Sequence, residues 1–445
     1  MKRDLSALQA REHDVLVIGG GIAGAWTVWE AASRGLNAAL VELDDFGQAS
    51  SWSSLKTAHG GLRHLQRLDI AGFRESVRER RALLCVAPEI VHPLTFAIPL
   101  SGLFDRVKFF FGGIANDILS LDRNDYVRPD RAIGVSRVVG KAEAASLSTR
   151  ALPPGSAFLW QDAQITHTER LLLGLLHAAA GESAVIVNHC RIESGLSTAS
   201  GFELKARDAA TGAELVLRAR SIVNAAGAQI EAVSGIFGET CLSPPLIRGV
   251  NVVLGSDLTP SLAVGTRDGD RFLFLAPWLG RSILGTRYDD DKGPLDTLVH
   301  DLLEAGRRAF PLAKIQDDQV RAVHVGHVPA GPDGEPIYRS RLISHQNPRL
   351  VSILTAKYTT ARATAQAAID RLGPILARTL PPSVSARKPL VMARPLSGTL
   401  AERLRSVEEG EMALSREDAV RGRLLEGARG ETIEPESPLR GLKIG

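Results

Sequence analysis

The chain has 445 residues, of which 44% are hydrophobic and 23% charged, and its formal net charge is +3. At about 150 residues per domain, this length suggests two or three domains with a large buried core. The near balance of 53 basic and 50 acidic residues gives no indication of a clustered basic face, so we expect no nucleic-acid partner.

The cysteines and the lack of long apolar runs constrain the class of protein further. Cys85, Cys190 and Cys241 are isolated, without CxxC spacing, so we expect neither a disulfide framework nor a metal site, and a reducing compartment fits. No run of about 20 apolar residues is present, and residues 1–14 lack the apolar core of a signal peptide. We therefore expect a cytoplasmic protein, with the inner face of the cell membrane as an alternative location.

The first predicted elements form a dinucleotide-binding motif. Residues 15–18 read VLVI, a continuous apolar run typical of a strand buried on both faces of a parallel sheet. Gly19, Gly21 and Gly24 follow at GxGxxG spacing, and a helical pattern begins at once. These glycines allow a tight turn, close approach of a pyrophosphate, and close packing of helix on strand. The helix N-terminus adds unpaired N–H groups and the positive end of a dipole for the phosphates.

An acidic residue ends the next predicted strand, over residues 37–42. Glu42 lies 18 residues after Gly24, where a carboxylate can accept hydrogen bonds from an adenosine ribose. The same negative charge would repel a 2′-phosphate. The motif therefore indicates FAD or NAD.

The following segment favours a flavin. A simple NAD-binding domain would continue with another strand and helix, but residues 48–61 are polar, small and glycine-containing, as in a loop that wraps a cofactor. Ser53 and Ser54 supply hydroxyl groups, Lys56 supplies a charge, and Gly60 leaves the backbone unobstructed.

Residues 53–65 read SSLKTAHGGLRHL, which resembles the SSxKxxHGGLRYL motif of the FAD-dependent glycerol-3-phosphate dehydrogenase family. Weaker similarity continues through FLWQDAQITHTERLLLGLLHAA, SIVNAAGAQIEAV, SILGTRYDDD and SILTAKYTTARATAQAAIDRL. The resemblance covers roughly residues 12–372.

The resemblance implies an α/β fold, more fully an α+β flavoprotein. A Rossmann-like FAD-binding domain would be joined to an antiparallel-sheet substrate domain and a small helical C-terminal region. The expected divisions are FAD-binding residues 12–90, 151–235 and 346–375, substrate-domain residues 91–150 and 236–345, and a reduced C-terminal region at 376–445.

The resemblance also implies the site residues. Arg63, His64, Arg339 and Lys357 would bind an anionic substrate, with Arg63 and Lys357 also acting in catalysis. FAD would be bound by residues that recur along the chain: Gly19, Gly21, Gly24, Glu42, Ser53, Ser54, Lys56, His59, Gly60, Ala226, Gly227, Lys357 and Thr359.

The chain departs from the family at position 64, in the segment around Val328, and in its reduced C-terminal region. Val328 stands where the family's GVRPL-type segment has an arginine, and His64 replaces a tyrosine. His324 and His327 enter the altered segment, and His327 could take the hydroxyl proton as a base, since an unperturbed histidine titrates near pH ~6.5. Alternatively, both histidines line the polar face of a strand. The missing arginine puts glycerol 3-phosphate itself in question, more than the flavin chemistry.

These features predict an FAD-dependent dehydrogenase that oxidises a small anionic polyol, glycerol 3-phosphate or a related hydroxylated substrate, by hydride transfer to the flavin. Electrons would pass to a quinone, oxygen or a protein acceptor. Two alternatives stay open: an amino-acid or amine oxidase of the same superfamily, and a non-catalytic flavin-binding protein. A homodimer is a further open question.

Residues 103–119 are apolar, with Arg106 and Lys108 among them. They could lie in a membrane interface, but the glycines at 112 and 113 interrupt an amphipathic pattern, so we favour a helix packed under the substrate domain. Near the C-terminus, Ser415 followed by acidic residues predicts a helix N-cap.

Overall fold

The computed structural model describes residues 1–147, 149–269 and 271–391, which form two compact units. The helix predicted after Ser415 lies outside the described residues. The first unit contains residues 1–52, 167–246 and 328–391, and the second contains residues 53–166 and 247–327. The chain therefore passes from the first unit to the second and back again twice.

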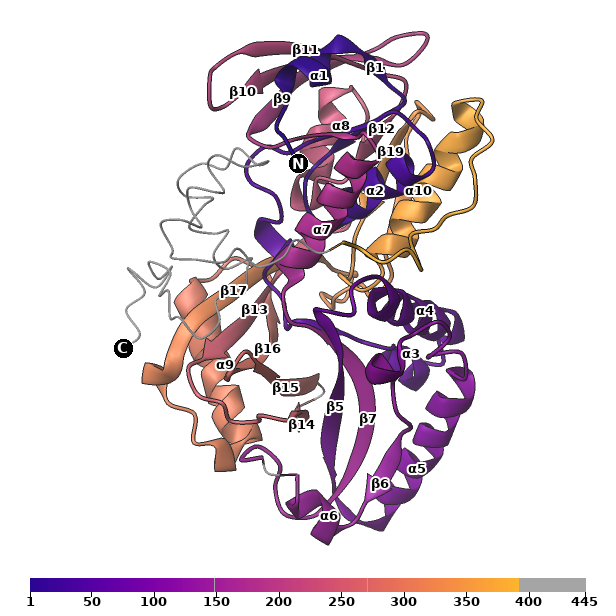
Figure 1. Cartoon of the computed structure of the whole chain (residues 1–445). Helices are drawn as coiled ribbons and strands as arrows, with labels where there is room; N and C mark the ends of the chain where they lie inside the picture. The colour runs from indigo at the N-terminus through magenta and orange to yellow at the C-terminus, as the bar shows by residue number, and fades with distance from the viewer. Residues whose placement is uncertain (148, 270, 392–445) are drawn as a thin grey trace, which may run out of the picture. The chain divides into compact units, whose positions relative to one another are not determined.

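The first unit is built on a mainly parallel sheet with the strand order β18-β19-β12-β2-β3-β8. Two of its strands, β12 and β19, are labelled in Figure 1. All neighbouring pairs are parallel except β18 and β19. The central strands are apolar and buried on both faces, as the sequence predicts for β2. The strands are β2 Val15–Ile18, β3 Ala38–Val41, β8 Val185–Val187, β12 Ile222–Asn224, β18 Arg341–Ser344 and β19 Leu350–Leu354.

Helix α2 is the central helix of the first unit and follows β2 directly. It is buried along almost its whole length and packs against both α7 and α10. Its small residues, such as Ala25, Ala31 and Ala32, allow this burial on all sides. The helices of the unit are α1 Leu5–Ala10, α2 Ile22–Ser33, α7 Thr168–Gly181, α8 Ile230–Ile236 and α10 Ala361–Ile375.

A second, smaller sheet of the first unit has the order β1-β11-β10-β9. Its apolar face packs in one cluster with residues of α1 and with Phe237, which follows α8. The strands are β1 Glu12–His13, β9 Cys190–Ser197, β10 Phe202–Asp208 and β11 Glu214–Ala219.

The second unit contains a large sheet in the order β17-β13-β16-β15-β14-β5-β7-β4, with β6 added beside β7. Strand β16 pairs antiparallel with β13 and β15, β15 with β14, and β7 with β4, β5 and β6, whereas β14 and β5 are parallel. The predicted fold class, a Rossmann-like part with an antiparallel-sheet part, is therefore confirmed. The strands are β4 Thr57–Ala58, β5 Val91–Leu100, β6 Arg137–Val139, β7 Ser156–Ile165, β13 Leu246–Leu254, β14 Leu262–Asp268, β15 Arg271–Trp278, β16 Arg281–Asp289 and β17 Val320–Pro329.

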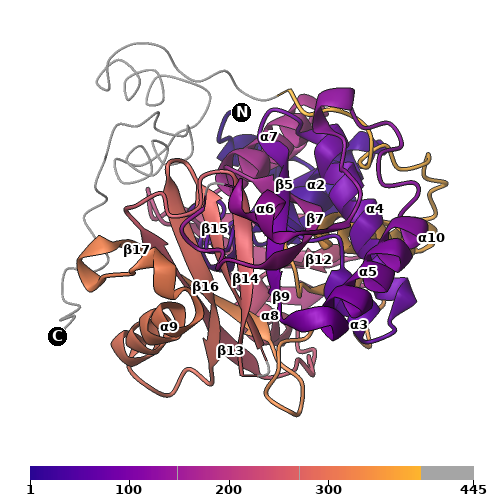
Figure 2. The same ribbon diagram turned by 90° about the horizontal axis from the view of Figure 1, so that it is seen from below.

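Helix α9 covers one face of this sheet, beside strands β14, β15 and β16 (Figure 2). Leu298, Leu302 and Leu303 recur at helical spacing and are buried in the core beneath it, as expected of an amphipathic helix. The helices of the second unit are α3 Leu62–Gln66, α4 Ile70–Val86, α5 Gly102–Leu119, α6 Lys141–Ala145 and α9 Leu295–Ala309. Short 3-10 turns occur at Ala49–Ser51, Pro129–Arg131, Gly227–Gln229, Pro311–Ala313 and Asp317–Gln319.

Helix α5 corrects two expectations. It runs without a break through Gly112 and Gly113. Most of its apolar side chains are exposed rather than packed on the second unit, with Phe104 79% and Phe111 63% exposed, although Phe109 packs on Phe158. The periodicity shows that one face is apolar but not that this face points away from the protein. No helix among the described residues is long and apolar enough to span a membrane.

Candidate functional site

The glycine turn of the first unit brings three backbone segments into direct contact. Gly19 has a φ of +109°, and a Cβ atom placed on it would lie 2.6 Å from the carbonyl oxygen of Ala225. A Cβ on Gly24 would overlap the carbonyl oxygen of Gly19. Both glycines are therefore required for the β2 turn to pass between β12 and the start of α2.

Glu42 lies directly after β3, beside this turn. Its carboxylate accepts hydrogen bonds from the backbone N–H groups of Gly20 and Asp44. Burial raises the pKa of the Glu42 carboxyl above its ordinary value, although these N–H donors favour the ionised form. The carboxylate thus lies at the edge of the turn, the position predicted for binding a ribose.

Ser51, one of the hydroxyl-bearing residues of the polar loop at 48–61, also contacts the glycine turn. Its Oγ accepts a hydrogen bond of 3.0 Å from the N–H of Ile22, the first residue of α2. It also limits the space above Gly21, because a Cβ there would lie 3.0 Å from the Ser51 Oγ. The hydroxyl therefore occupies the N-terminus of α2, where phosphate oxygens would be expected to bind.

Two further segments of the first unit carry predicted residues. Ala226 and Gly227 follow β12, and Gly227 has a φ of +57°. Farther along, Lys357 Nζ lies 5.5 Å from the centre of the Tyr338 ring. The Ser340 hydroxyl is 3.1 Å from the Thr360 hydroxyl, and it accepts a hydrogen bond from the N–H of Ala356.

These contacts bring the segment that carries Arg339 against the segment that carries Lys357 and Thr359. The Arg339 side chain is exposed, whereas Thr359 is buried at the start of α10. Two cations predicted to bind substrate therefore come from adjoining segments of the first unit.

In the second unit, the serine-rich loop contains an orphaned polar atom. Ser53 is buried, and its Oγ has no hydrogen-bond partner within the part of the chain that the structure describes. Lys56 is also buried, with a φ of +59° and its Nζ 5.5 Å from the Trp278 ring centre. The N–H of Lys56 donates to the Ser54 hydroxyl. A buried hydroxyl normally has a partner, so Ser53 fits a loop that binds a further group.

His59 and Gly60 follow β4 and contact a residue that the sequence did not single out. Asp162 on β7 accepts a hydrogen bond of 2.6 Å from the Gly60 N–H and lies 3.2 Å from His59 Nδ1. It also forms a buried ion pair with Arg80 of α4. The aspartate was not found because its partners are about a hundred positions away in the sequence.

Helix α3 carries Arg63 and His64, the residues predicted to bind substrate in this unit. Gly61 begins the helix with a φ of +90°, and Arg63 is exposed. His64 is buried, and its Nδ1 lies 2.9 Å from the Asp69 carboxylate, which also caps α4. The two side chains therefore differ, because Arg63 is exposed and His64 is held by a hydrogen bond with Asp69.

The structure corrects the alternative that both histidines of β17 line one polar face. They are three residues apart, so they lie on opposite faces of the strand. His324 is buried, with Nδ1 3.1 Å from the Ser54 carbonyl oxygen. His327 is partly exposed, and its Nε2 lies 2.9 Å from the Asp291 carboxylate.

Asp291 joins His327 to a larger charged network. It forms a 2.8 Å ion pair with Arg248 of β13, which also binds Asp289 through two hydrogen bonds. The hydrogen bond to Asp289 raises the pKa of Arg248. Because Asp289 and Asp291 compensate its charge, Arg248 is a weak candidate for binding an anion.

Among the described residues, Cys85, Cys190 and Cys241 form no disulfide. Across residues 1–147, 149–269 and 271–391, no group of three or more His, Cys, Asp or Glu side chains could hold a metal ion.

The sequence matches the FAD dependent oxidoreductase family over residues 14–371. The chain therefore belongs to this family. A glycerol-3-phosphate dehydrogenase of Synechocystis is 28% identical over 432 residues, covering 89% of this chain and 76% of the relative. A mitochondrial glycerol-3-phosphate dehydrogenase of Arabidopsis thaliana is 29% identical over 399 residues, covering 82% of this chain. This chain spans only 61% of the Arabidopsis protein.

Solved structures show the same fold. Glycerol-3-phosphate dehydrogenase from Bacillus halodurans, solved with FAD, has a TM-score of 0.66 at 20% identity and covers 95% of this chain and 77% of its own. Glycine oxidase from Geobacillus kaustophilus has a TM-score of 0.56 at 18% identity and covers 87% of this chain and 100% of its own. Enzymes with different substrates therefore share this architecture.

The family's cofactor is FAD, and the described residues fit it. The glycine turn leaves no room for side chains, and Glu42 lies beside it where a ribose would bind. The buried Ser53 hydroxyl has no hydrogen-bond partner among the described residues, so it could bind the cofactor. The binding role of each residue stays a prediction.

Gly24→Ala tests the turn. The added methyl group would overlap the Gly19 carbonyl, so we expect α2 to shift and the purified protein to contain less than about a tenth of the wild-type flavin. Absorbance at the flavin band per mole of protein measures this loss. Gly235→Ala in α8 is the control, because no atom lies within 4 Å of its added methyl group. Full flavin content in Gly24→Ala would contradict the assignment.

Proposed function

We propose that the protein is an FAD-dependent dehydrogenase that oxidises a small anionic polyol, glycerol 3-phosphate or a related hydroxylated compound. The observation that carries this proposal is the contact between the Tyr338–Ser340 region and the segment around Lys357. It supports the role of Arg339 and Lys357 as cations that bind one anionic group. The similarity to glycerol-3-phosphate dehydrogenases over most of the chain supports the substrate class.

Arg63, Arg339 and Lys357 would bind the anionic end of the substrate. A guanidinium group donates two parallel hydrogen bonds to a phosphate or carboxylate, and a lysine adds a compact point charge. Arg63 and Arg339 are both exposed, which leaves them accessible to a solute.

When bound, FAD accepts the hydride that leaves the substrate carbon. A hydroxyl proton must leave the same substrate, and His327 is proposed to receive it. Its Nε2 lies 2.9 Å from the Asp291 carboxylate, a contact that can orient the imidazole ring. The two electrons would then pass to a quinone, oxygen or a protein acceptor.

Two alternatives follow from the missing arginine at Val328. An amino-acid or amine oxidase would use the same cations for a carboxylate, and the shared fold with glycine oxidase is compatible with it. A non-catalytic flavin-binding protein would keep FAD but lack turnover. Hydrogen peroxide with ammonia would identify the oxidase, and FAD reduced by dithionite but by no tested substrate would identify the non-catalytic protein.

Anaerobic mixing with sn-glycerol 3-phosphate, other polyol phosphates, hydroxy acids and amino acids tests the proposal through the flavin absorbance. We expect polyol phosphates to bleach the wild-type flavin. Arg63→Ala should keep its FAD and be reduced at least about a hundredfold more slowly, because a charge-assisted contact of roughly 3 kcal/mol is removed. Arg78→Ala, an exposed arginine of α4, is the control. Unchanged kinetics in Arg63→Ala would refute its role.

We further propose that α5 docks on an anionic phospholipid surface at the inner face of the membrane. Exposed apolar side chains recur every three or four residues and form one stripe along the 18-residue helix. They include Leu103, Phe104, Val107, Phe110, Phe111 and Ile118.

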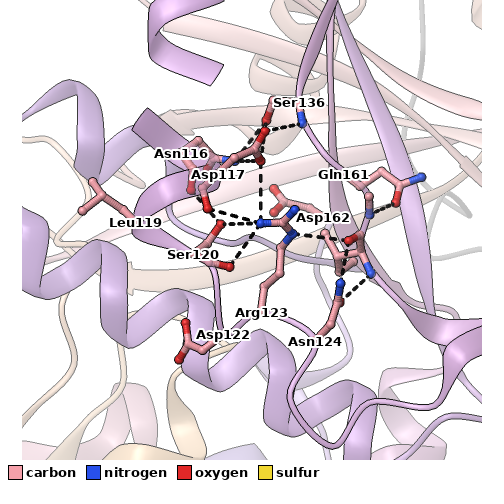
Figure 3. Close-up of polar contacts among 12 residues, drawn as sticks. Asn116, Asp117, Leu119, Ser120, Asp122, Arg123, Asn124, Ser136, Gln161 and Asp162 are labelled. Atoms are coloured by element: carbon pink, nitrogen blue, oxygen red, sulfur yellow. Dashed lines mark hydrogen bonds and ion pairs between the residues drawn. The ribbon is translucent and has the colours of Figure 1, made fainter. Parts of the chain in front are cut away.

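The opposite face of α5 is fixed to the protein by polar contacts, which Figure 3 shows around Arg123. The Ser136 N–H donates to Asp117, and the Asn116 side chain donates to the Ser136 hydroxyl. Arg123 donates to the carbonyl oxygens of Asp117 and Ser120. The inward face thus combines these polar contacts with Phe109, which packs on Phe158, while most of the apolar side chains of α5 point outward.

The charges beside the stripe favour lipid over protein as the occupant. Arg106 and Lys108 are exposed on α5, whereas the Asp105 carboxylate accepts the Ser101 N–H at the start of the helix. An apolar stripe flanked by cations is typical of helices that lie in the interface of anionic bilayers. The exposed Leu121, just beyond α5, extends the same apolar surface.

Sedimentation with vesicles of phosphatidylcholine and phosphatidylglycerol tests this docking. The double variant Phe104→Ser, Phe111→Ser should bind at least about tenfold more weakly, since each phenylalanine contributes roughly 1 kcal/mol or more on burial. Leu242→Ser is the control, because Leu242 is 83% exposed in the first unit. Equal vesicle binding by the double variant would contradict the proposal. So would a self-association of the wild type that the substitutions abolish without any vesicle binding, which would assign the stripe to a homodimer.

A further inference from the structure

Four nitrogen atoms of the described residues converge on the carboxylate of Asp162. Oδ1 accepts from the Gly60 N–H and from an Arg80 guanidinium nitrogen, and Oδ2 lies 3.2 Å from both His59 Nδ1 and Trp160 Nε1. Asp162 is 2% exposed, and Arg80 is also buried. The donors come from β7 itself, from α4 and from the turn after β4.

Only an ionised carboxylate satisfies this set of donors. Each of its oxygens accepts two hydrogen bonds, whereas an amide or a protonated acid would turn a donor toward one of the N–H groups. Burial acts to raise the pKa of Asp162, but the hydrogen bond from His59 and the charge of Arg80 outweigh it and lower the pKa. Both the hydrogen-bond geometry and the lowered pKa therefore indicate that Asp162 is ionised.

The ionised carboxylate determines which nitrogen of His59 carries a proton. Because Asp162 can only accept, His59 Nδ1 must be the N–H donor. In the neutral imidazole, Nε2 then carries a lone pair that can accept a hydrogen bond. The Thr57 hydroxyl lies 2.9 Å from Nε2, where it can donate. The ring is thus held from both sides in one tautomer.

The strand register makes this arrangement rigid. Thr57 pairs with Gln164 and Ala58 with Ala163, so the antiparallel β4–β7 pair places His59 opposite Asp162. At the next position, a Cβ on Gly60 would overlap the Arg80 guanidinium. The turn therefore needs a glycine where the backbone donates to Asp162. Phe96 and Phe274 contact the ring of His59 at centroid distances of 5.6 and 6.1 Å.

We propose that Asp162 is a positioning residue that fixes the Nδ1–H tautomer of His59, with Nε2 accepting from the Thr57 hydroxyl, in the turn predicted to bind FAD. Asp162 acts through His59 and Gly60, while Arg80 keeps it ionised. The effect on flavin reduction rests on the proposed function, whereas the tautomer of His59 does not.

Nitrogen-15 NMR of the FAD-loaded protein labelled at histidine tests the tautomer directly. His59→Gln assigns the His59 signals by their disappearance. In the wild type, we expect neutral His59 to show its proton on Nδ1 and a bare Nε2. A proton on Nε2, or averaging between the two tautomers, would overturn the proposal without any Asp162 variant having to fold.

Asp162→Asn should lose the fixed tautomer and reduce the rate of flavin reduction at least tenfold. Asp162→Glu retains a carboxylate and should recover part of the fixed tautomer and part of the reduction rate. Asp208→Asn is the matched control, because Asp208 is a buried aspartate that forms an ion pair with Arg3 in the first unit. It should change neither readout. An Asp162→Asn protein that keeps both the tautomer and the wild-type rate would refute the positioning role.

The two readouts separate this inference from the proposed function. If no substrate reduces the wild-type flavin, the proposed function fails, but the NMR result still decides the tautomer. If the substrate reduces the flavin and His59 carries its proton on Nε2, the proposed function stands and the role of Asp162 is refuted.

Discussion

The close approach of the backbone at Gly19 to the end of β12 is the constraint on which the first unit depends. The Gly19 N–H donates to the Val41 carbonyl, and the Ala225 N–H donates to the Ile18 carbonyl, both at 2.9 Å. The carboxyl ends of β2, β3 and β12 are therefore joined by backbone hydrogen bonds. This close contact leaves no volume for side chains at Gly19 and Gly24, and it places Glu42 and the N-terminus of α2 at one edge of the sheet.

The second unit depends on a different kind of constraint, a buried charge. A carboxylate removed from water is costly unless donors replace the lost hydration. At Asp162, the donors that replace it belong to the turn, to α4 and to β7, so satisfying the charge also fixes the turn. Each unit has a glycine where the backbone makes its closest contact: Gly19 against Ala225 in the first unit, and Gly60 against Arg80 in the second. A side chain at either position would push the contacting group away.

Local signals made much of the fold predictable. The apolar run of β2, the glycine spacing and the acid after β3 lie within 30 residues and follow from the geometry of one strand, turn and helix. The contacts of Asp162 were not predictable, because they depend on a strand register between residues more than 100 positions apart. The outward face of α5 was missed because periodicity identifies an apolar stripe but not the direction in which it points. The three-residue spacing of His324 and His327 did carry the information that they occupy opposite faces.

The proposed mechanism depends on which substrate binds, and the cations available for its anionic group limit the choice. Val328 removes one cation, and Arg248 is compensated by two aspartates. We propose the anion-binding role for Arg63, Arg339 and Lys357, and arginine and lysine side chains suit a phosphate or a carboxylate equally. The carbon that loses hydride distinguishes a polyol phosphate from an amino acid more directly than the anion does.

The most direct measurement is anaerobic stopped-flow reduction of the flavin by sn-glycerol 3-phosphate carrying deuterium at C2, compared with the unlabelled compound. If hydride leaves the carbon that bears the hydroxyl group, the deuterated substrate should bleach the flavin several-fold more slowly. Equal rates would show that cleavage of this bond does not limit the reduction. A flavin that stays oxidised with both compounds, but is bleached by an amino acid, would contradict the assigned substrate class.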